Sequence, residues 1–478
     1  MNKQDLSRRR FLRWSAAGTA ASALGVGSLA NLLIPARSAW AVDYKALVCI
    51  FLYGGNDGMN TIVPTDSRYT QYNTVRGALA LPQSSLVGLN GVPFGLHPSL
   101  AALQSVWASG QMATVFNVGP LAVPFADKAA YRAATVAAGT LPESLFSHSD
   151  QQILWQTAST SSQTRTGWGG RAASAMSTVQ PVIAVGGNGH YGLSATRAQL
   201  AVPSSPGSDF NASGLNDPWT VNVKRKAAID ALYAADGADV ALSQAYATQM
   251  RDAFVVSSSL EPLIKQTPAT TTPPATLQTI NAAFSSLISN GQVQGRLAQQ
   301  LYQTAKLIAN NATVGGNRQL YFADHGGFDT HGDQIGATSL VGTHADLLKQ
   351  LGDAVAAFHS AMNALGLGQQ VTLFTQSDFG RTFAPNNSRG TDHAWGNHHM
   401  VLGGAVHGGT YGTYPQLDLA GPDDVGVQSW ERQGRWIPST SVEQYAAPML
   451  RWFGASNGQL ASILPNLSRF TAPALTFV

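Results

Sequence analysis

Short apolar runs recur along the chain and predict the strands of a buried sheet. The first, residues 46–52, reads Ala-Leu-Val-Cys-Ile-Phe-Leu without a polar interruption, which is typical of a parallel strand covered on both faces. Similar runs predict strands at residues 113–118, 181–185, 320–322, 370–374 and 400–404. Apolar residues at helical spacing predict helices at residues 97–109, 294–309 and 340–365. This alternation predicts an α/β fold with a mostly parallel central sheet and helices on both faces.

A segment of different composition interrupts the alternation at about residues 205–290. It begins with a loop rich in Gly, Ser and Asn, continues through a helical stretch at residues 224–254, and ends near a Thr/Pro-rich linker at residues 267–274. We therefore expect residues 42–478 to form a single domain that carries a largely helical insertion at about residues 205–290.

The N-terminus predicts export. Residues 7–12 read Ser-Arg-Arg-Arg-Phe-Leu, a twin-arginine signature, and a modestly apolar stretch at residues 16–34 precedes Ala-Trp-Ala at residues 39–41. The alternative is a membrane anchor, but the stretch is rich in Gly, Ala and Ser and stops at Pro35, so it fits a bilayer span poorly. We expect residues 1–41 to be a signal peptide and the protein to be exported folded, to the periplasm or beyond, without a stable membrane anchor.

Charge and cysteine content narrow the classes of partner and site. The whole chain carries 29 basic and 26 acidic residues, but residues 1–41 contain six basic residues and one acid, which leaves 23 and 25 in the remainder. This balance argues against a nucleic-acid partner. Cys49 is the only cysteine, so neither an intrachain disulfide nor a thiolate metal site is possible.

Eight of the 11 histidines lie between His325 and His407, in a window that also contains Asp324, Asp329, Asp378 and Asp392. Imidazole nitrogen and carboxylate oxygen together bind divalent ions such as zinc and manganese. The clustering therefore predicts metal chemistry.

Strand order gives an independent reason to expect a site. Asp57, Asp329, His331 and Asp378 each follow a predicted strand. The carboxyl ends of parallel strands share one edge of a sheet, and ligands bind outside that edge. We expect these four side chains to meet there.

The chain resembles the domain of unknown function 1501 family of exported bacterial proteins, which is similar to the alkaline phosphatase and sulfatase superfamily. The motifs that carry the resemblance are Phe-Leu-Tyr-Gly-Gly-Asn-Asp-Gly-Met-Asn at residues 51–60, Leu-His-Pro at 96–98, Ser-His at 147–148, Gly-Gly-Phe-Asp-Thr-His at 326–331, Ser-Asp-Phe-Gly-Arg-Thr at 377–382 and Gly-Thr-Asp-His at 390–393. The resemblance implies an alkaline-phosphatase-like fold and an exported, metal-dependent hydrolase of phosphate or sulfate esters.

The resemblance also implies roles for particular residues. One or two divalent ions (zinc, manganese, calcium or magnesium) would be bound by a set of aspartates and histidines: Asp57, Asp329, His331, Asp378 and His393, with His398 or His399 in reserve. Ser147 would be the nucleophile, with His148 and Ser149 as alternatives. Departures from the superfamily pattern leave the metal count and the nucleophile open, because Asp378 is followed by Phe379 rather than His and only one residue separates Asp329 from His331.

Other interpretations of the same residues remain open. Arg381 fits a bidentate clamp on a small anionic ester or a structural ion pair. Ser147 could be a plain helix cap, and Asp392 could orient His393. The alternative to the enzyme is a non-catalytic periplasmic binding or assembly protein that retains the fold. By analogy, its partner would be an exported protein of the unknown-function 1800 family.

Overall fold

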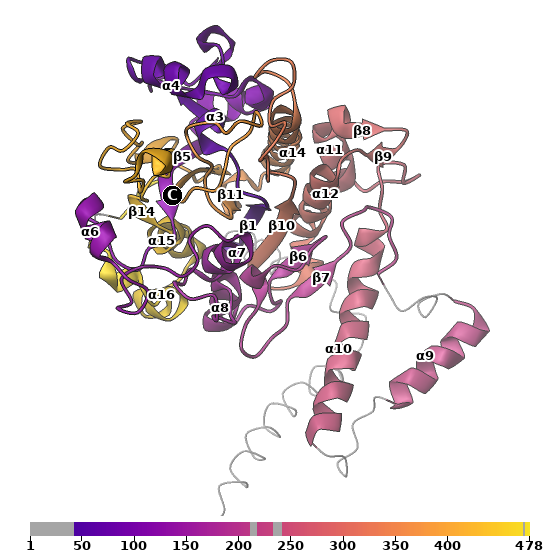
Figure 1. Ribbon diagram of the computed structural model, residues 1–478. Coiled ribbons are helices and arrows are strands. Elements are labelled where there is room, and N and C mark those ends of the chain that lie inside the picture. Colours follow the sequence, from indigo (N-terminus) through magenta and orange to yellow (C-terminus); the bar gives the residue numbers. More distant parts are fainter. Residues whose placement is uncertain (1–42, 211–217, 233–240, 472–473) are drawn as a thin grey trace, which may run out of the picture. The chain divides into compact units, whose positions relative to one another are not determined.

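The computed structural model describes residues 43–210, 218–232, 241–471 and 474–478. The predicted signal peptide, residues 1–41, lies outside the described residues. The described residues from Lys45 onward form one unit, built around a central sheet with helices on both sides (Figure 1). Among the described helices, none is both long enough and apolar enough to cross a membrane.

The central sheet has the strand order β13-β5-β12-β11-β1-β10-β6-β7, with β14 also paired to β5. Its strands are β1 (Lys45–Leu52), β5 (Met112–Gly119), β6 (Ile183–Val185), β7 (Leu200–Val202), β10 (Arg318–His325), β11 (Val371–Ser377), β12 (Asn397–Gly403), β13 (Gly409–Gly412) and β14 (Thr440–Ser441). The central strand β1 runs parallel to both of its neighbours, β10 and β11. The reversed strand is β12, which pairs antiparallel with β11 and β5. The predicted α/β fold with a mostly parallel sheet is confirmed.

Four helices cover one face of the sheet, and large side chains form the core between these helices and the strands. The helices are α7 (His148–Thr157), α8 (Trp168–Ala175), α15 (Val442–Phe453) and α16 (Asn457–Ile463). Alternate residues of β1, including Cys49, pack against Trp155, Trp168 and Tyr445 of these helices. Cys49 is fully buried, and burial raises the pKa of its thiol well above the ordinary value.

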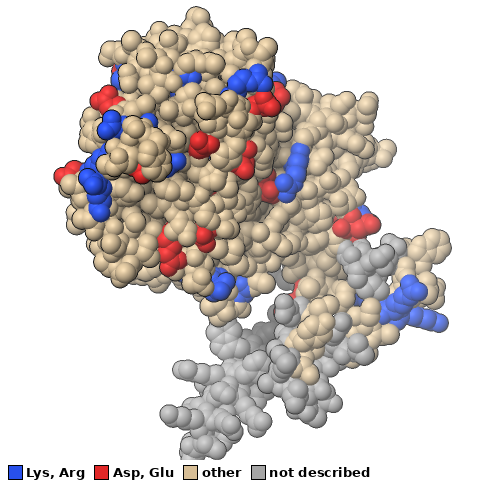
Figure 2. Space-filling view, in the orientation of Figure 1, with Lys and Arg blue, Asp and Glu red and all other residues tan. Residues whose placement is uncertain are grey.

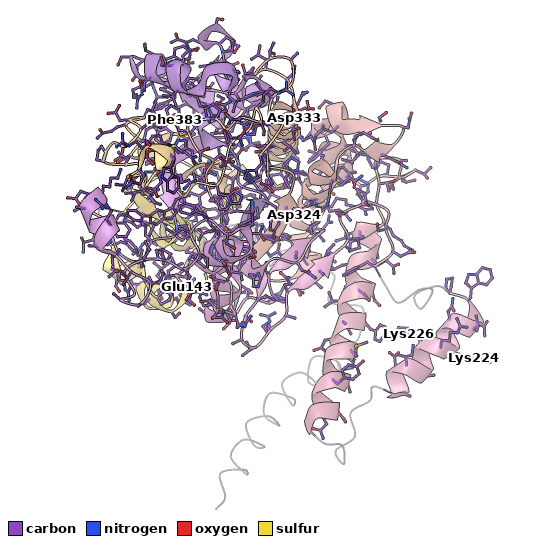
Figure 3. The ribbon with its side chains drawn as sticks, in the orientation of Figure 1. Glu143, Lys224, Lys226, Asp324, Asp333 and Phe383 are labelled. Carbon is purple, nitrogen blue, oxygen red and sulfur yellow. The ribbon has the colours of Figure 1, made fainter. Side chains whose placement is uncertain are left out.

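On the other side of the sheet in Figure 1 lie α12 (Arg296–Ala309) and α14 (Thr343–Ala364), which pack against each other. Both agree with the helices predicted at residues 294–309 and 340–365. The described part of residues 205–290 contains three longer helices, α9 (Thr220–Leu232), α10 (Ala241–Ile264) and α11 (Ala275–Ala283). Lys224 and Lys226 belong to α9 (Figure 3).

Shorter elements complete the described chain. The short helices are α3 (Gly58–Thr61), α4 (Arg68–Arg76), α5 (Gln104–Ala108), α6 (Lys128–Ala133) and α13 (Asn311–Val314). Two small sheets contain β2 (Ile62–Pro64), β3 (Val87–Gly88) and β4 (Phe94–Leu96), and β8 (Ile288–Ser289) with β9 (Gln292–Val293). On the face drawn in Figure 2, basic and acidic side chains are scattered and form no continuous basic patch.

Five of the described histidines are buried in the interior: His97, His325, His344, His398 and His399. Burial lowers the pKa of His399 to about 3 and that of His344 to about 4. The His399 ring packs against Trp155, with ring centroids 4.7 Å apart, and its Nε2 has no hydrogen-bond partner among the described residues. These rings are therefore neutral in the folded protein at neutral pH.

The buried histidines predict a loss of stability in mild acid. An unfolded histidine takes up a proton as pH falls below about 6.5, whereas folded His399 does not do so until about pH 3. The stability is therefore fully present above pH 6.5 and declines as pH falls towards 3, by about 2 kcal/mol for one such histidine at pH 5. We expect His399→Phe to lose about 2 kcal/mol less than the wild type between pH 7 and pH 5, in urea-unfolding measurements of both proteins. The exposed His407, changed to Phe, is the control, and equal pH dependence of His399→Phe and wild type would contradict the prediction.

Candidate metal centre

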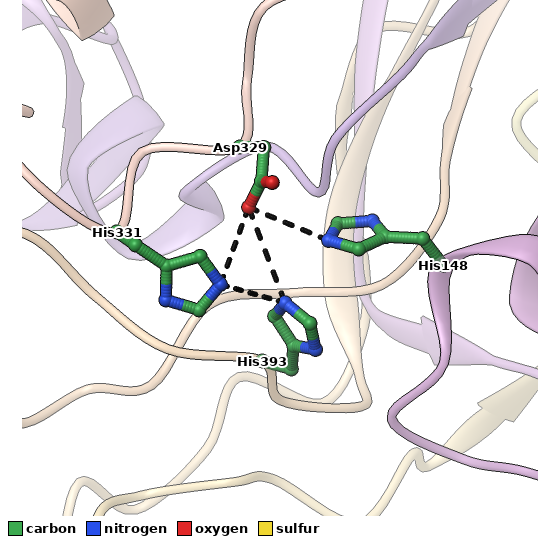
Figure 4. A group of neighbouring side chains, drawn as sticks. All are labelled: His148, Asp329, His331 and His393. Atoms are coloured by element: carbon green, nitrogen blue, oxygen red, sulfur yellow. Dashed lines mark hydrogen bonds and ion pairs between the residues drawn. The ribbon is translucent and has the colours of Figure 1, made fainter.

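Four side chains converge beyond the carboxyl edge of the sheet: His148, Asp329, His331 and His393 (Figure 4). One ligand atom from each lies within 4.8 Å of the other three. His148 is the first residue of α7, Asp329 and His331 follow β10, and His393 lies between β11 and β12. Segments that are far apart in sequence therefore supply one group of imidazoles and a carboxylate.

The Asp329 carboxylate lies opposite the three imidazoles. Its Oδ1 is 3.3 Å from His331 Nε2, 3.4 Å from His148 Nε2 and 4.0 Å from His393 Nε2. The Nε2 atoms of His331 and His393 are 2.8 Å apart. Two ligands of one tetrahedral zinc ion lie about 3.3 Å from each other, so these separations fall on both sides of the value that the ion requires.

Each of the three rings is held by an acceptor at its other nitrogen. His148 Nδ1 donates to Asp378 Oδ2 at 2.6 Å, and His331 Nδ1 donates to Asp392 Oδ1 at 2.9 Å. His393 Nδ1 donates to the Phe146 carbonyl at 2.7 Å. Because these oxygens can only accept, the proton of each neutral ring lies on Nδ1 and the Nε2 lone pairs face the shared point. This is the arrangement that orients histidines around metal ions.

The charge states also suit a cation. Burial lowers the pKa of His393 to about 4, the Phe146 carbonyl opposes this shift, and His148 and Arg381 add to it. His393 is therefore neutral at neutral pH, as a ligand must be. Burial alone would raise the pKa of Asp329, but the hydrogen bond and positive charge of Arg381, together with His148 and His331, hold it below the ordinary value.

Asp378, a predicted metal ligand, lies behind His148 rather than in the converging group. Its side chain is fully buried, and Oδ2 accepts hydrogen bonds from His148 and from Gln152 Nε2, the latter at 2.9 Å. Asp392 also orients an imidazole, although the ring is that of His331 and not that of its neighbour His393. Two carboxylates near the site therefore act through histidines.

The structure places Asp57 outside the group. Asp57 Oδ1 accepts from the backbone nitrogens of Met59 and Asn60 at the start of α3, and Oδ2 accepts from Gln334 Nε2 at 2.6 Å. Asp57 is also ion-paired with Arg76, and both side chains are fully buried. Burial alone would raise the pKa of Asp57, but the positive charge of Arg76 is the first of several effects that lower it. Both carboxylate oxygens therefore have partners within the fold.

His398 is also separate from the group. Its Nδ1 accepts from the backbone nitrogen of Asn117 at 3.1 Å, and its ring packs near Phe116 and Tyr414. Burial lowers the pKa of His398 to about 3. The ring is thus a neutral part of the packed interior.

Arg381 has an acceptor for every guanidinium nitrogen. Nε donates to the Gly55 carbonyl at 2.9 Å and Nη1 to the Thr391 carbonyl at 3.0 Å. Nη2 donates to Asp329 Oδ1 at 2.6 Å and also to the carbonyls of Gly54 and Phe328. Arg381 is fully buried and positions Asp329, so it has no free edge for the bidentate clamp considered from the sequence.

Ser147 lies immediately before His148, as the N-cap residue of α7. Its side chain makes no capping hydrogen bond, and its Oγ is 3.2 Å from Ser149 Oγ. The sequence analysis predicts a catalytic role for the following residue, His148, and does not include it among the metal ligands. The position of His148 at a predicted helix start, beyond the edge of the sheet, is the sequence feature that could have indicated a role as metal ligand.

Two family models match the sequence. The model described as "Protein of unknown function (DUF1501)" matches residues 91–427, more than half of the chain, and a model of the twin-arginine translocation pathway signal sequence matches residues 5–25. No curated protein matches the sequence significantly. The chain therefore belongs to the DUF1501 family and carries a signal for export of the folded protein across the membrane.

Proposed function

We propose that this exported protein binds a divalent metal ion through His148, Asp329, His331 and His393 and hydrolyses phosphate or sulfate esters. The observation that carries the proposal is the set of three imidazoles whose Nδ1 atoms are fixed by oxygen acceptors and whose Nε2 atoms face Asp329. Helix or loop packing alone does not require three imidazole nitrogens to point at one carboxylate.

The chemistry of the four side chains favours one ion of a borderline metal. Three imidazoles and one carboxylate suit zinc or manganese better than calcium or magnesium, which prefer sites made of oxygen ligands. His148 Nε2 is buried and has no hydrogen-bond partner among the described residues, as expected of a ligand atom. A single group of four within 4.8 Å fits one ion rather than two.

The surrounding residues would fix the geometry of the reaction. Asp378, Asp392 and the Phe146 carbonyl hold the three rings, while Arg381 holds Asp329. A bound divalent ion supplies a Lewis acid that neutralises charge on a phosphoryl or sulfuryl oxygen.

Ser147 is the proposed nucleophile. It adjoins His148, and its hydroxyl is not used to cap α7. The backbone N–H groups of the first turn and the helix dipole favour an oxyanion beside it.

The proposed metal site predicts the metal content of the purified protein. Protein exported by its own signal and purified without chelators should contain about one zinc or manganese ion per chain by elemental analysis. His331→Ala should abolish stoichiometric metal, and Asp378→Asn should weaken affinity by about 10- to 100-fold, because it removes the acceptor that orients His148. His407→Ala, at an exposed histidine outside the group, is the matched control. A metal-free wild type that also fails to bind added zinc or manganese would refute the metal site.

The proposed activity predicts hydrolysis of a simple ester by the metal-loaded protein. The metal-loaded protein should cleave an aryl phosphate or an aryl sulfate, and Ser147→Ala should lower kcat by at least about a hundredfold with metal content unchanged. Ser174→Ala, at an exposed serine of α8, controls for the substitution. A loss confined to Ser149→Ala would reassign the nucleophile. A metal-loaded wild type that is inert towards both ester classes would favour the non-catalytic binding protein, and its exported partner would then be sought.

A further inference from the structure

A second arginine, Arg435, lies beside the candidate metal centre in a segment that the sequence did not single out. Its backbone is fixed on both sides, because its N–H donates to Asp424 Oδ1 at 3.1 Å and its carbonyl accepts from Val425 at 3.0 Å. The side chain is partly buried. The backbone from which the guanidinium extends is therefore held in place by the fold.

The Arg435 guanidinium stacks over the ring of Phe146, with its central carbon 5.1 Å from the ring centroid. Phe146 also supplies the carbonyl that holds His393, and the next two residues are Ser147 and His148. The cation thus packs on the segment that contains the proposed nucleophile and one of the proposed ligands.

The charge of Arg435 also acts on Asp392, the carboxylate that holds His331. Asp392 Oδ1 accepts from His331 Nδ1 at 2.9 Å, and the positive charge of Arg435 interacts with the same carboxylate. Arg435 is therefore in electrostatic reach of residues that support both His331 and His393.

Arg435 has unused hydrogen-bonding capacity, in contrast to Arg381. Its Nη2 donates to Gln433 Oε1 at 2.7 Å, whereas its buried Nε has no hydrogen-bond partner among the described residues. The nearby Glu431 accepts from the backbone nitrogens of Val427 and Gln428 instead. A buried N–H without an acceptor is unfavourable by about 1–3 kcal/mol, so an acceptor oxygen that reached this nitrogen would be stabilising.

We propose that Arg435 binds the tetrahedral oxyanion of the substrate, a phosphate or sulfate group, and is the residue that selects for it. This rests on the proposed function, because it places the anion beside the metal group. The guanidinium offers several N–H donors in a fixed plane and a permanent positive charge, which match the oxygens of such an anion. Stacking on Phe146 keeps that plane in place.

Calorimetric titration of the metal-loaded protein with inorganic phosphate and with inorganic sulfate tests this proposal without requiring turnover. We expect the wild type to bind at least one of them and Arg435→Met to bind it about 10- to 100-fold more weakly, with unchanged metal content. Arg432→Met, at an exposed arginine three residues away, is the matched control and should bind like the wild type. If Arg435→Met is poorly folded, Arg435→Lys keeps the charge but loses the planar donors, and it should still bind several-fold more weakly than the wild type.

The outcomes separate this proposal from the proposed function. Anion binding that depends on Arg435 without hydrolysis of either ester supports the role of Arg435 and refutes the hydrolase. Hydrolysis with the same KM in wild type and metal-loaded Arg435→Met refutes the role of Arg435 and supports the hydrolase. A metal-loaded wild type that binds neither anion overturns the role of Arg435.

Discussion

The shared carboxyl edge of three parallel strands is the constraint on which the candidate site depends. Leu52 at the end of β1 lies in register with His325 of β10 on one side and with Ser377 of β11 on the other. The three strands therefore end at the same level, and the loops that follow them begin side by side. Asp329 and His331 leave from β10 and Asp378 leaves from β11, so a site at this edge needs only short loops.

Arg381 converts that edge into a fixed framework. Its guanidinium donates to carbonyls of the loop after β1, of the loop after β10 and of the loop before β12, and also to the Asp329 carboxylate. The loops after β1 and β10 can approach each other this closely only because Gly54 has no side chain. Gly54 has φ +109°, and a Cβ there would lie 2.4 Å from the backbone nitrogen of Asp329. The Gly-Gly pair and the buried arginine thus serve one purpose, which is to hold the carboxylate opposite the histidines.

Hydrophobic patterning was enough to predict the central sheet, because strands such as β1 are buried on both faces and appear as uninterrupted apolar runs. It could not reveal that β12 runs antiparallel to its neighbours, since an apolar run does not indicate the direction in which the strand will pair. The choice of metal-site residues was limited in another way. Asp57 follows a strand as Asp329 does, but its partner Arg76 lies 19 residues away on α4, in a stretch with no motif. Whether a carboxylate meets a cation or a cluster of imidazoles depends on side-chain packing that sequence spacing does not encode.

Formal charges around the centre explain why a cation and an anion would be bound together. Asp329, Asp378 and Asp392 carry three negative charges, Arg381 and Arg435 carry two positive ones, and the three ring nitrogens are arranged as neutral donors of lone pairs. The protein alone therefore presents one net negative charge at this position, which opposes an oxyanion. A divalent ion changes the sum to one net positive charge, and the partly exposed side chains of Asp329 and His331 leave that charge accessible to solvent. Affinity for phosphate or sulfate should thus be coupled to metal binding, with Arg435 adding selectivity only when the ion is present.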